Sequence, residues 1–308
     1  MVQTIIKFLM KIRESEVKFD IKAGAIFQEV FNHPRYVNLN EEAQIELGLK
    51  WANNLYQKEV NQPSFERYLG DINLSEYCQN AIMLDLGCYL GGKTVRWIEK
   101  YQGSEIYGVD IDSRFIKIAT CFANEKNVKA YFKLNFAEEL DFPDGFFDII
   151  LSENTFEHVI DIRKVMQECN RVLKKAGFMI IKFPSFWNPF DHHLDLVTQT
   201  PFIHWFFKYP ALLRAYFTIL DERGNDALWY RRQDEAPLPY EKGYYINGTG
   251  AMEFHRLVRD NWHIVIDSFK QKTHSNNVVK NMLINCIKIS QFGIFRELFP
   301  IAYILQKQ

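Results

Sequence analysis

Two aspartates, each at the end of an apolar run, stand where carboxylates could hold a ligand. In "AIMLDLGCYLGGKTVRWI" the run reaches Asp85 and then turns through Gly87 and Gly91 before a predicted helix. In "EIYGVDID" the next apolar run ends at Asp110. Ligands of open parallel sheets bind beyond the carboxyl ends of the strands, so we expect both carboxylates at one binding site.

The glycine spacing excludes two common phosphate-binding loops. Gly87-x-x-x-Gly91-Gly92 matches neither the G-x-G-x-x-G of dinucleotide sites nor the Walker loop. An acid before the glycines suits a cationic ligand without phosphate, and S-adenosylmethionine carries a sulfonium, an ammonium and no pyrophosphate. Asp85 can orient its ammonium, and Asp110 can accept hydrogen bonds from both ribose hydroxyls. The two aspartates therefore predict this cofactor.

The elements that position these residues alternate between strand and helix from residue 82 to residue 183. The predicted strands are "IMLDLG", "EIYGVDID", "KAYFKLN", "FFDIILSE" and "FMIIKFP". The predicted helices between them are "KTVRWIEKY", "SRFIKIATCFANE" and "IRKVMQECNRVLKKA", the last ending at Gly177. This alternation predicts an α/β fold, a parallel sheet with helices on both faces.

Flanking segments complete a single domain with four predicted parts. Residues 1–80 form a helical extension, 81–184 the cofactor-binding core, 185–245 an inserted aromatic cap, and 246–308 the rest of the sheet. The last part contains a Thr-capped helix "AMEFHRLVRD" and the strands "WHIVIDSF" and "AYILQK". In the extension, "NEEAQIELGLKWANNLYQ" is the clearest helix. The apolar residues of the first helix (Ile5, Phe8, Leu9, Ile12) are expected to pack on the domain, with membrane-surface binding as the alternative.

Composition narrows the functional classes. The 308 residues are 47% hydrophobic, enough for a core without disulfides or a structural metal. A net charge of −1 provides no basic excess, so we expect no nucleic-acid partner. The five cysteines are dispersed and lack zinc-ligand spacing, which predicts a cytoplasmic location and no metal site. Lys7 and Lys11 interrupt the apolar start, so we expect no signal peptide and no stable membrane insertion.

Four stretches carry a family resemblance: "LDLGCYLGG", "IYGVDID", "AEELDFPDGFFDIILSENTFEHV" and "ECNRVLKKAGFMIIKFPS". Through them residues 82–183 resemble the class I S-adenosylmethionine-dependent methyltransferases of the small-molecule group. The resemblance implies a Rossmann-like fold with a mostly parallel seven-stranded sheet, S-adenosylmethionine as cofactor and S-adenosylhomocysteine as product. It says little about the acceptor, because one fold serves many acceptors.

The resemblance also implies cofactor contacts on the glycine turn and after the second, third and fourth strands. In that order they are Asp85, Gly87, Cys88, Tyr89 and Gly91; Asp110 and Ile111; Asn135, Phe136 and Ala137; and Ser152 and Glu153. Tyr89 replaces the family's usual middle glycine, so its side chain must turn away from the cofactor or cover it. The usual adenine-binding acid is absent, which leaves Asn135 or a backbone amide to contact the base.

Methyl transfer requires mainly that the acceptor be aligned and water excluded. A carboxylate acceptor needs no base, whereas a hydroxyl does. The candidate bases are Glu157 and His158 of "TFEHV" and His192 and His193 of "FDHHLD". His193 is the first choice, since a histidine after the fifth strand faces the acceptor in related methyltransferases. Helix capping is the alternative role for Glu157 and His158.

The aromatic cap is expected to line a large apolar acceptor pocket. Its candidate acceptor contacts are Trp187, Trp205, Trp229, Tyr230 and Arg231, the last as a clamp for a carboxylate. We therefore expect a cytoplasmic methyltransferase, monomeric or homodimeric, that modifies oxygen of an apolar or aromatic small molecule or modified peptide in secondary metabolism. The alternatives are a quinone or lipid biosynthesis methyltransferase and a non-catalytic binding module.

Overall fold

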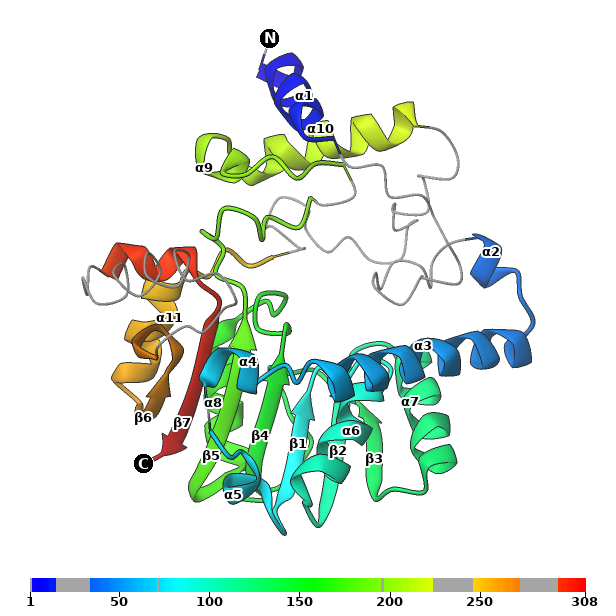
Figure 1. Ribbon diagram of the computed structural model, residues 1–308, viewed down its shortest axis with the longest axis vertical. Helices are drawn as coiled ribbons and strands as arrows, with labels where there is room; N and C mark the ends of the chain where they lie inside the picture. Colours follow the sequence, from blue (N-terminus) through cyan, green and yellow to red (C-terminus); the bar gives the residue numbers. More distant parts are fainter. Residues whose placement is uncertain (1, 15–33, 71, 195–196, 224–245, 272–292) are drawn as a thin grey trace.

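A seven-stranded, mostly parallel sheet organises the described part of the chain, which in this computed structural model comprises residues 2–14, 34–70, 72–194, 197–223, 246–271 and 293–308. The strand order is β3-β2-β1-β4-β5-β7-β6, with β7 antiparallel to both of its neighbours (Figure 1). The strands are β1 (Ile82–Leu86), β2 (Glu105–Asp110), β3 (Ala130–Leu134), β4 (Phe147–Glu153), β5 (Leu173–Phe183), β6 (Trp262–Asp267) and β7 (Ile301–Lys307). The predicted α/β fold class is confirmed.

Helices cover both faces of the sheet because successive strand residues point to opposite sides. Met83, Ile149 and Ile180 pack with α4 (Glu66–Leu69), α5 (Ser75–Cys78) and α6 (Gly92–Tyr101). Leu84 and Ile150 pack with α8 (Ile162–Val172) and α11 (Ala251–Arg259). Helices α3 (Glu41–Asn61) and α7 (Ser113–Lys126) extend the first layer (Figure 1). The short segments α2 (Pro34–Val37), η5 (Ser268–Lys270) and η6 (Gly293–Leu298) lie outside both layers.

The parallel register brings the carboxyl ends of four strands to one edge. Leu86 of β1 lies opposite Val109 of β2, and Asp110 of β2 lies opposite Leu134 of β3. On the other side of β1, Asp85 lies opposite Leu151 of β4. The segments that follow these strands therefore meet, as expected from their order along the chain.

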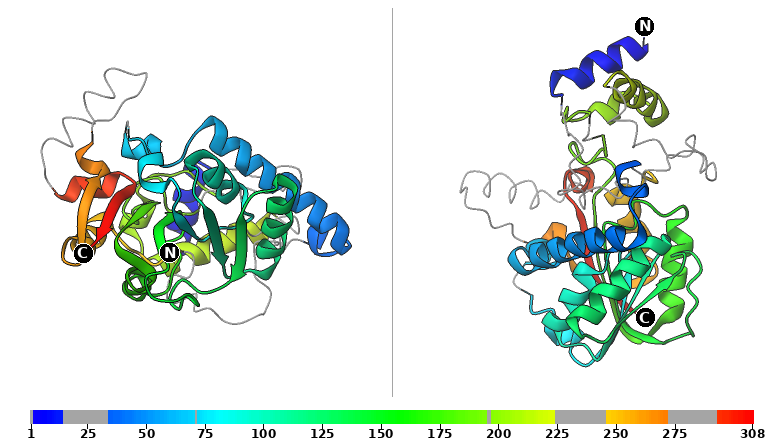
Figure 2. Two further views of the ribbon diagram at one scale, coloured as in Figure 1. Left: turned by 90° about the horizontal axis from the view of Figure 1, so that it is seen from below. Right: turned by 90° about the vertical axis from the view of Figure 1, so that its right-hand side faces the viewer.

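The cap lies above this edge and includes the first helix of the chain. Helices α9 (Ile203–Phe206) and α10 (Tyr209–Glu222) are joined by α1 (Val2–Ile12), which crosses α10 (Figures 1 and 2). The Gln3 side chain donates to the Ala211 carbonyl at 3.1 Å, and Lys7 pairs with Glu222. The predicted helical extension is thus divided, since α1 packs on the cap and α3 on the sheet layer.

Three local predictions were wrong. The helix before β5 ends at Val172 and not at Gly177, because the chain from Leu173 already pairs with β4, where Lys174 forms an ion pair with Asp148. Helix α11 has no threonine cap. The Glu297 carboxylate, far away in sequence, accepts the N–H groups of its first two residues, Ala251 and Met252, at 2.7 and 3.0 Å.

The third wrong prediction concerns the buried side of α1. This side carries Ile6 and Met10 rather than the expected Ile5, Phe8 and Ile12. These three are exposed, Phe8 at 67%. No helix among the described residues is long and apolar enough to cross a bilayer.

Substitutions on the two sides of α1 are expected to differ in stability. Ile6→Ala removes a fully buried side chain and should lower the free energy of unfolding of the cap by about 2–5 kcal/mol. Phe8→Ala, on the exposed side, should change it by less than about 0.5 kcal/mol. Hydrogen exchange of the α10 amides measures both. Equal protection in the two variants would contradict the packing of α1 on α10.

Candidate active site

The turn after β1 needs glycine at its first position. Gly87 has φ +85°, and a Cβ there would lie 2.1 Å from Oγ1 of Thr155, the second residue after β4. The N–H groups of Gly87 and Cys88 both donate to the Val109 carbonyl at 2.9 Å, which ties the turn to β2. Gly91, at φ +75°, ends the turn against Ala119 of α7. The predicted glycine turn therefore lies beside both β2 and the segment after β4.

Tyr89 adopts the backbone conformation that the family's usual glycine would adopt. Its φ is 48°, in the left-handed region that costs a side-chain-bearing residue roughly 1–2 kcal/mol. The ring packs edge-on against Phe115 of α7, with centroids 4.6 Å apart. Its backbone N–H donates to Oδ2 of Asp110 at 2.9 Å. The ring therefore packs on α7, and its position relative to the cofactor, turned away or covering it, stays a prediction.

Asp110 lies next to the glycine turn, as predicted. Besides the Tyr89 N–H, its carboxylate accepts the Asp112 N–H at 3.3 Å, and each oxygen keeps a second lone pair. Burial raises the pKa of Asp110 to about 6, against the opposing effect of these backbone donors. The group is therefore ionised at neutral pH and able to accept two further hydrogen bonds.

Asp85 is more deeply buried than Asp110. Its carboxylate accepts the hydroxyl of Thr94 in α6, and burial raises its pKa to about 7. The positive charge of Lys93 opposes this shift. The carboxyl thus lies under the turn, between β1 and the first turn of α6.

Apolar side chains surround Asp110 at the end of the sheet. Ile111, Leu134 and Phe136 are exposed, Phe136 at 62%, whereas Ala137 is buried. The Asn135 side chain is held within its own loop, with Oδ1 accepting from Asp141 N–H at 2.9 Å and Nδ2 donating to the Glu139 carbonyl at 3.0 Å. A carboxylate beside an apolar shelf, with a glycine turn that allows close backbone approach, fits a ribose joined to a flat base.

At the end of β4, the two predicted contacts with the methionine part of the cofactor have other partners. The Ser152 hydroxyl donates to the Leu86 carbonyl at 2.9 Å. Glu153 forms ion pairs with Lys93 and, at 3.6 Å, with Lys182. Although burial raises the pKa of Glu153, the two lysines hold it below its usual value. Both side chains stabilise this end of the sheet, and their contact with a cofactor stays a prediction.

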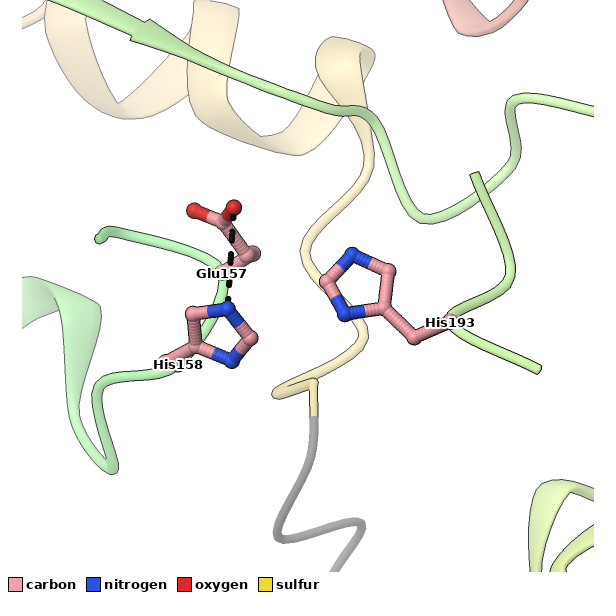
Figure 3. A group of neighbouring side chains, drawn as sticks. All are labelled: Glu157, His158 and His193. Atoms are coloured by element: carbon pink, nitrogen blue, oxygen red, sulfur yellow. Dashed lines mark ion pairs between the residues drawn. The ribbon is translucent and has the colours of Figure 1, made fainter. Parts of the chain in front are cut away.

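Three of the four candidate bases come together from two segments (Figure 3). Glu157 and His158 follow β4, and His193 enters from the loop after β5. Glu157 Oε1 lies 3.8 Å from His158 Nε2, and one ligand atom from each of the three side chains lies within 4.8 Å of the others. The rings of His158 and His193 have centroids 5.2 Å apart. The arrangement groups one carboxyl with two imidazoles.

Burial shifts the protonation of this group. It raises the pKa of Glu157 to about 8 and lowers that of His193 to about 3, where His158 adds to the effect. His193 also has φ 55°, so its backbone is in the left-handed region. At neutral pH the His193 imidazole is neutral, so one ring nitrogen offers a lone pair.

Asn247 holds the segment that carries Glu157 and His158. Its side-chain amide donates to the carbonyls of Phe156 and Val159 at 2.6 and 3.0 Å, and its N–H donates to that of Glu157 at 2.7 Å. Sequence reasoning missed Asn247, whose only signal was the turn-like "INGTG". It also missed Asp191, which lines a cavity of about 10 Å³ together with Glu157, His193 and Asn247.

Two expectations about the candidate bases were wrong. Glu157 and His158 do not cap α8, because Asp161 does so by accepting the N–H groups of Arg163 and Lys164 at 3.0 and 3.1 Å. His192 does not join His193. Its ring is buried in the cap beside His204, and its Nδ1 accepts the Leu194 N–H at 3.2 Å.

The predicted acceptor contacts are only partly described. Trp187 and Trp205 are each 41% exposed and are joined by a hydrogen bond from Trp205 Nε1 to the Trp187 carbonyl at 3.1 Å. Trp229, Tyr230 and Arg231 lie outside the described residues.

Comparison with known proteins matches residues 84–181 to a methyltransferase domain model. An uncharacterised methyltransferase of Bacillus subtilis is 36% identical over 115 residues, 37% of this chain and 44% of that protein. Ajmaline N-methyltransferase of Rauvolfia serpentina is 33% identical over 101 residues, 32% of this chain and 34% of that enzyme. A ubiquinone biosynthesis O-methyltransferase of Mesorhizobium japonicum is 31% identical over 99 residues, which are 32% of this chain and 39% of that enzyme.

A solved protein of Pyrococcus horikoshii aligns with 92% of this chain and all of that one, at 18% identity and a TM-score of 0.47. The chain spans less than half the length of the curated relatives named above. The shared segment runs from the glycine turn through β5 and includes Asp110. Residues 84–181 are thus a methyltransferase domain similar to those of the class I S-adenosylmethionine-dependent methyltransferases.

Proposed function

We propose that the protein transfers the methyl group of S-adenosylmethionine to an oxygen of an apolar or aromatic small molecule. One observation carries the proposal, the contact between Gly87 and Thr155, which places the cofactor turn next to the segment of Glu157 and His158. His193 reaches the same group from the cap side. The glycine turn and the three candidate bases therefore lie at one edge of the sheet, which supports the proposal.

The residues have distinct roles in this proposal. The bound cofactor supplies a methyl group activated by a positively charged sulfur. Asp110 binds the ribose hydroxyls, and Gly87 lets the backbone approach. His193, neutral at pH 7, accepts the proton of an acceptor hydroxyl and lies beside Glu157 and His158. The exposed rings of Trp187 and Trp205 bind the apolar part of the acceptor.

Cofactor affinity should depend on the charge of Asp110. Asp110→Asn keeps the shape of the side chain and should weaken S-adenosylmethionine binding by about 1.5–3 kcal/mol, the usual contribution of hydrogen bonds to a charged group. Because the pKa of Asp110 is about 6, affinity of the parent protein should fall as the pH drops below 6.

The part of this pH dependence that comes from Asp110 should disappear in Asp110→Asn, and the part that comes from Asp85, with a pKa of about 7, should remain. Titration calorimetry between pH 5 and 8 measures both effects, with Asp141→Asn, an exposed carboxylate paired with Lys133, as the matched control. An unchanged affinity in Asp110→Asn would contradict the ribose assignment, and the absence of any S-adenosylmethionine binding by the parent would favour a non-catalytic module.

A base at position 193 should be visible in the pH profile. A mass-spectrometric screen of phenols and aromatic acids for the gain of a methyl group would first identify an acceptor. In His193→Asn the new residue also tolerates the positive φ of this position, but its amide cannot accept the proton. The kcat for a hydroxyl acceptor should therefore fall about a hundredfold or more, and it should recover partly at high pH.

Cofactor affinity should stay unchanged in this variant, and His263→Asn, on the exposed side of β6, is the control. A raised acceptor KM without recovery in alkali would indicate a carboxylate acceptor. Full activity at every pH would remove His193 from the site.

A second candidate is methylation of a membrane-dissolved acceptor such as a quinone, and the cap surface favours it. Val2, Ile5, Phe8 and Ile12 are exposed on one side of α1, and Phe206 of α9 is exposed as well. The described cap segments, 2–14 and 197–223, carry six basic residues against three acidic ones, in a chain with a net charge of −1. Apolar and basic groups together suit the surface of an anionic bilayer.

Sedimentation with vesicles tests this candidate. The protein should bind vesicles of anionic phospholipid and bind neutral ones more weakly, and Phe8→Ser with Phe206→Ser should reduce binding without changing S-adenosylmethionine affinity. Absence from the vesicle pellet at low salt would leave the water-soluble acceptor as the proposal.

A further inference from the structure

The group formed by Glu157, His158 and His193 has the chemistry of a metal site. Two imidazoles and one carboxylate are a known ligand set for zinc, which binds three protein ligands in catalytic sites and leaves a fourth position open. The cysteine spacing that argued against a metal is irrelevant here, because none of these ligands is a cysteine. Glu157 and His158 are adjacent in sequence, and His193 comes from another loop. This spacing matches no sequence motif for a metal site.

Their geometry is close to that of a bound ion. With bonds of about 2.0–2.1 Å, neighbouring ligand atoms of a tetrahedral site lie about 3.4 Å apart. Glu157 Oε1 and His158 Nε2 are 3.8 Å apart, and all three ligand atoms lie within 4.8 Å of one another. Closure thus requires side-chain shifts of about 1 Å. His158, on the exposed side of the group, has room for such a shift.

A second observation points to a missing cation. Glu157 is 5% exposed, and its Oε2 accepts no hydrogen bond from the described residues. A buried carboxyl oxygen without a partner is unfavourable, because nothing replaces the hydrogen bonds that it loses to water. The Asn247 clamp holds the backbone of this residue in place, so the side chain cannot escape to solvent by a small rearrangement of the turn.

We propose that Glu157, His158 and His193 bind a divalent cation of the zinc class. The adjoining cavity of about 10 Å³, lined also by Asp191, has room for about one water molecule and supplies the open position. The ion would connect the segment after β4 to the cap loop after β5. One consequence rests on the proposed function: with the ion bound, His193 would serve as a ligand in place of the proton acceptor, and an acceptor hydroxyl bound to the ion would release its proton to water more readily.

Metal binding can be measured without cofactor or acceptor. The full-length chain, free of any histidine tag and treated with EDTA, is titrated with ZnCl₂ by calorimetry, and its melting temperature is followed in parallel. We expect one ion per chain and a rise in melting temperature on binding. Cobalt(II) should give the spectrum of a four-coordinate site without a sulfur-to-metal charge-transfer band, since no cysteine is a ligand.

Variants locate the ion. His158→Asn and His193→Asn should each weaken zinc binding at least about 100-fold, more than loss of a residue that only supports a ligand. His263→Asn, a histidine outside the group, should bind as the parent does. If His193→Asn fails to fold, the zinc affinity of His158→Asn tests the site, because the His158 side chain is exposed.

No binding at one equivalent, unchanged affinity in His158→Asn, or a thiolate band with cobalt would overturn the site. S-adenosylmethionine binding measured on the same protein separates this outcome from failure of the proposed methyl transfer.

Discussion

The site depends on the absence of a side chain at Gly87. Because nothing projects from its Cα, Thr155 can lie directly against the turn after β1 and donate its hydroxyl to the Leu86 carbonyl at 3.0 Å. The Thr155 carbonyl in turn accepts the His158 N–H at 2.9 Å. The glycine turn proposed to bind the cofactor and the segment of Glu157 and His158 are thereby fixed together. Any larger residue at position 87 would separate them.

The cap is joined to this arrangement by a few long-range hydrogen bonds. Asn247 binds the segment around Glu157, and the Thr249 carbonyl accepts the Phe186 N–H at 3.0 Å at the start of the cap loop. Glu297 completes the connection by capping α11 and accepting the Ser185 hydroxyl. The position of His193 therefore follows from residues in three distant parts of the chain. This explains how a surface insertion can present a side chain to the sheet edge with a defined geometry.

Sequence reasoning succeeded where structure is local or periodic. Short apolar runs locate the strands, and the rule for parallel sheets correctly brings Asp85 and Asp110 to one edge. Sequence reasoning failed where a residue far away in the chain determines the local structure. No local signal shows that Glu297 replaces a threonine cap, that pairing with β4 ends α8 at Val172, or that α10 buries Ile6 rather than Phe8.

His192 and His193 show the same limit at single-residue scale. They are adjacent and chemically identical, yet the left-handed backbone at His193 sends the two rings into different environments. A left-handed backbone at a residue other than glycine is set by the surrounding contacts. The sequence alone therefore cannot show which of the two histidines faces the sheet edge. Trp229, Tyr230 and Arg231 stay predictions for a related reason, since their roles depend on tertiary contacts outside the described residues.

Three buried acids along one edge explain the kind of ligand that the site favours. Burial raises the pKa values of Asp110, Asp85 and Glu157 to about 6, 7 and 8, whereas carboxyls of an unfolded chain titrate near about 4. Their contribution to folding stability is therefore full below pH about 4 and is lost as the pH rises through about 6 to 8. At neutral pH, buried acids of this kind therefore lower the free energy of unfolding. A ligand carrying positive charge recovers part of that stability, because it favours the ionised form of each acid. The cationic cofactor proposed for Asp85 and Asp110, and the divalent cation proposed for Glu157, both meet this requirement, which an anionic nucleotide would not.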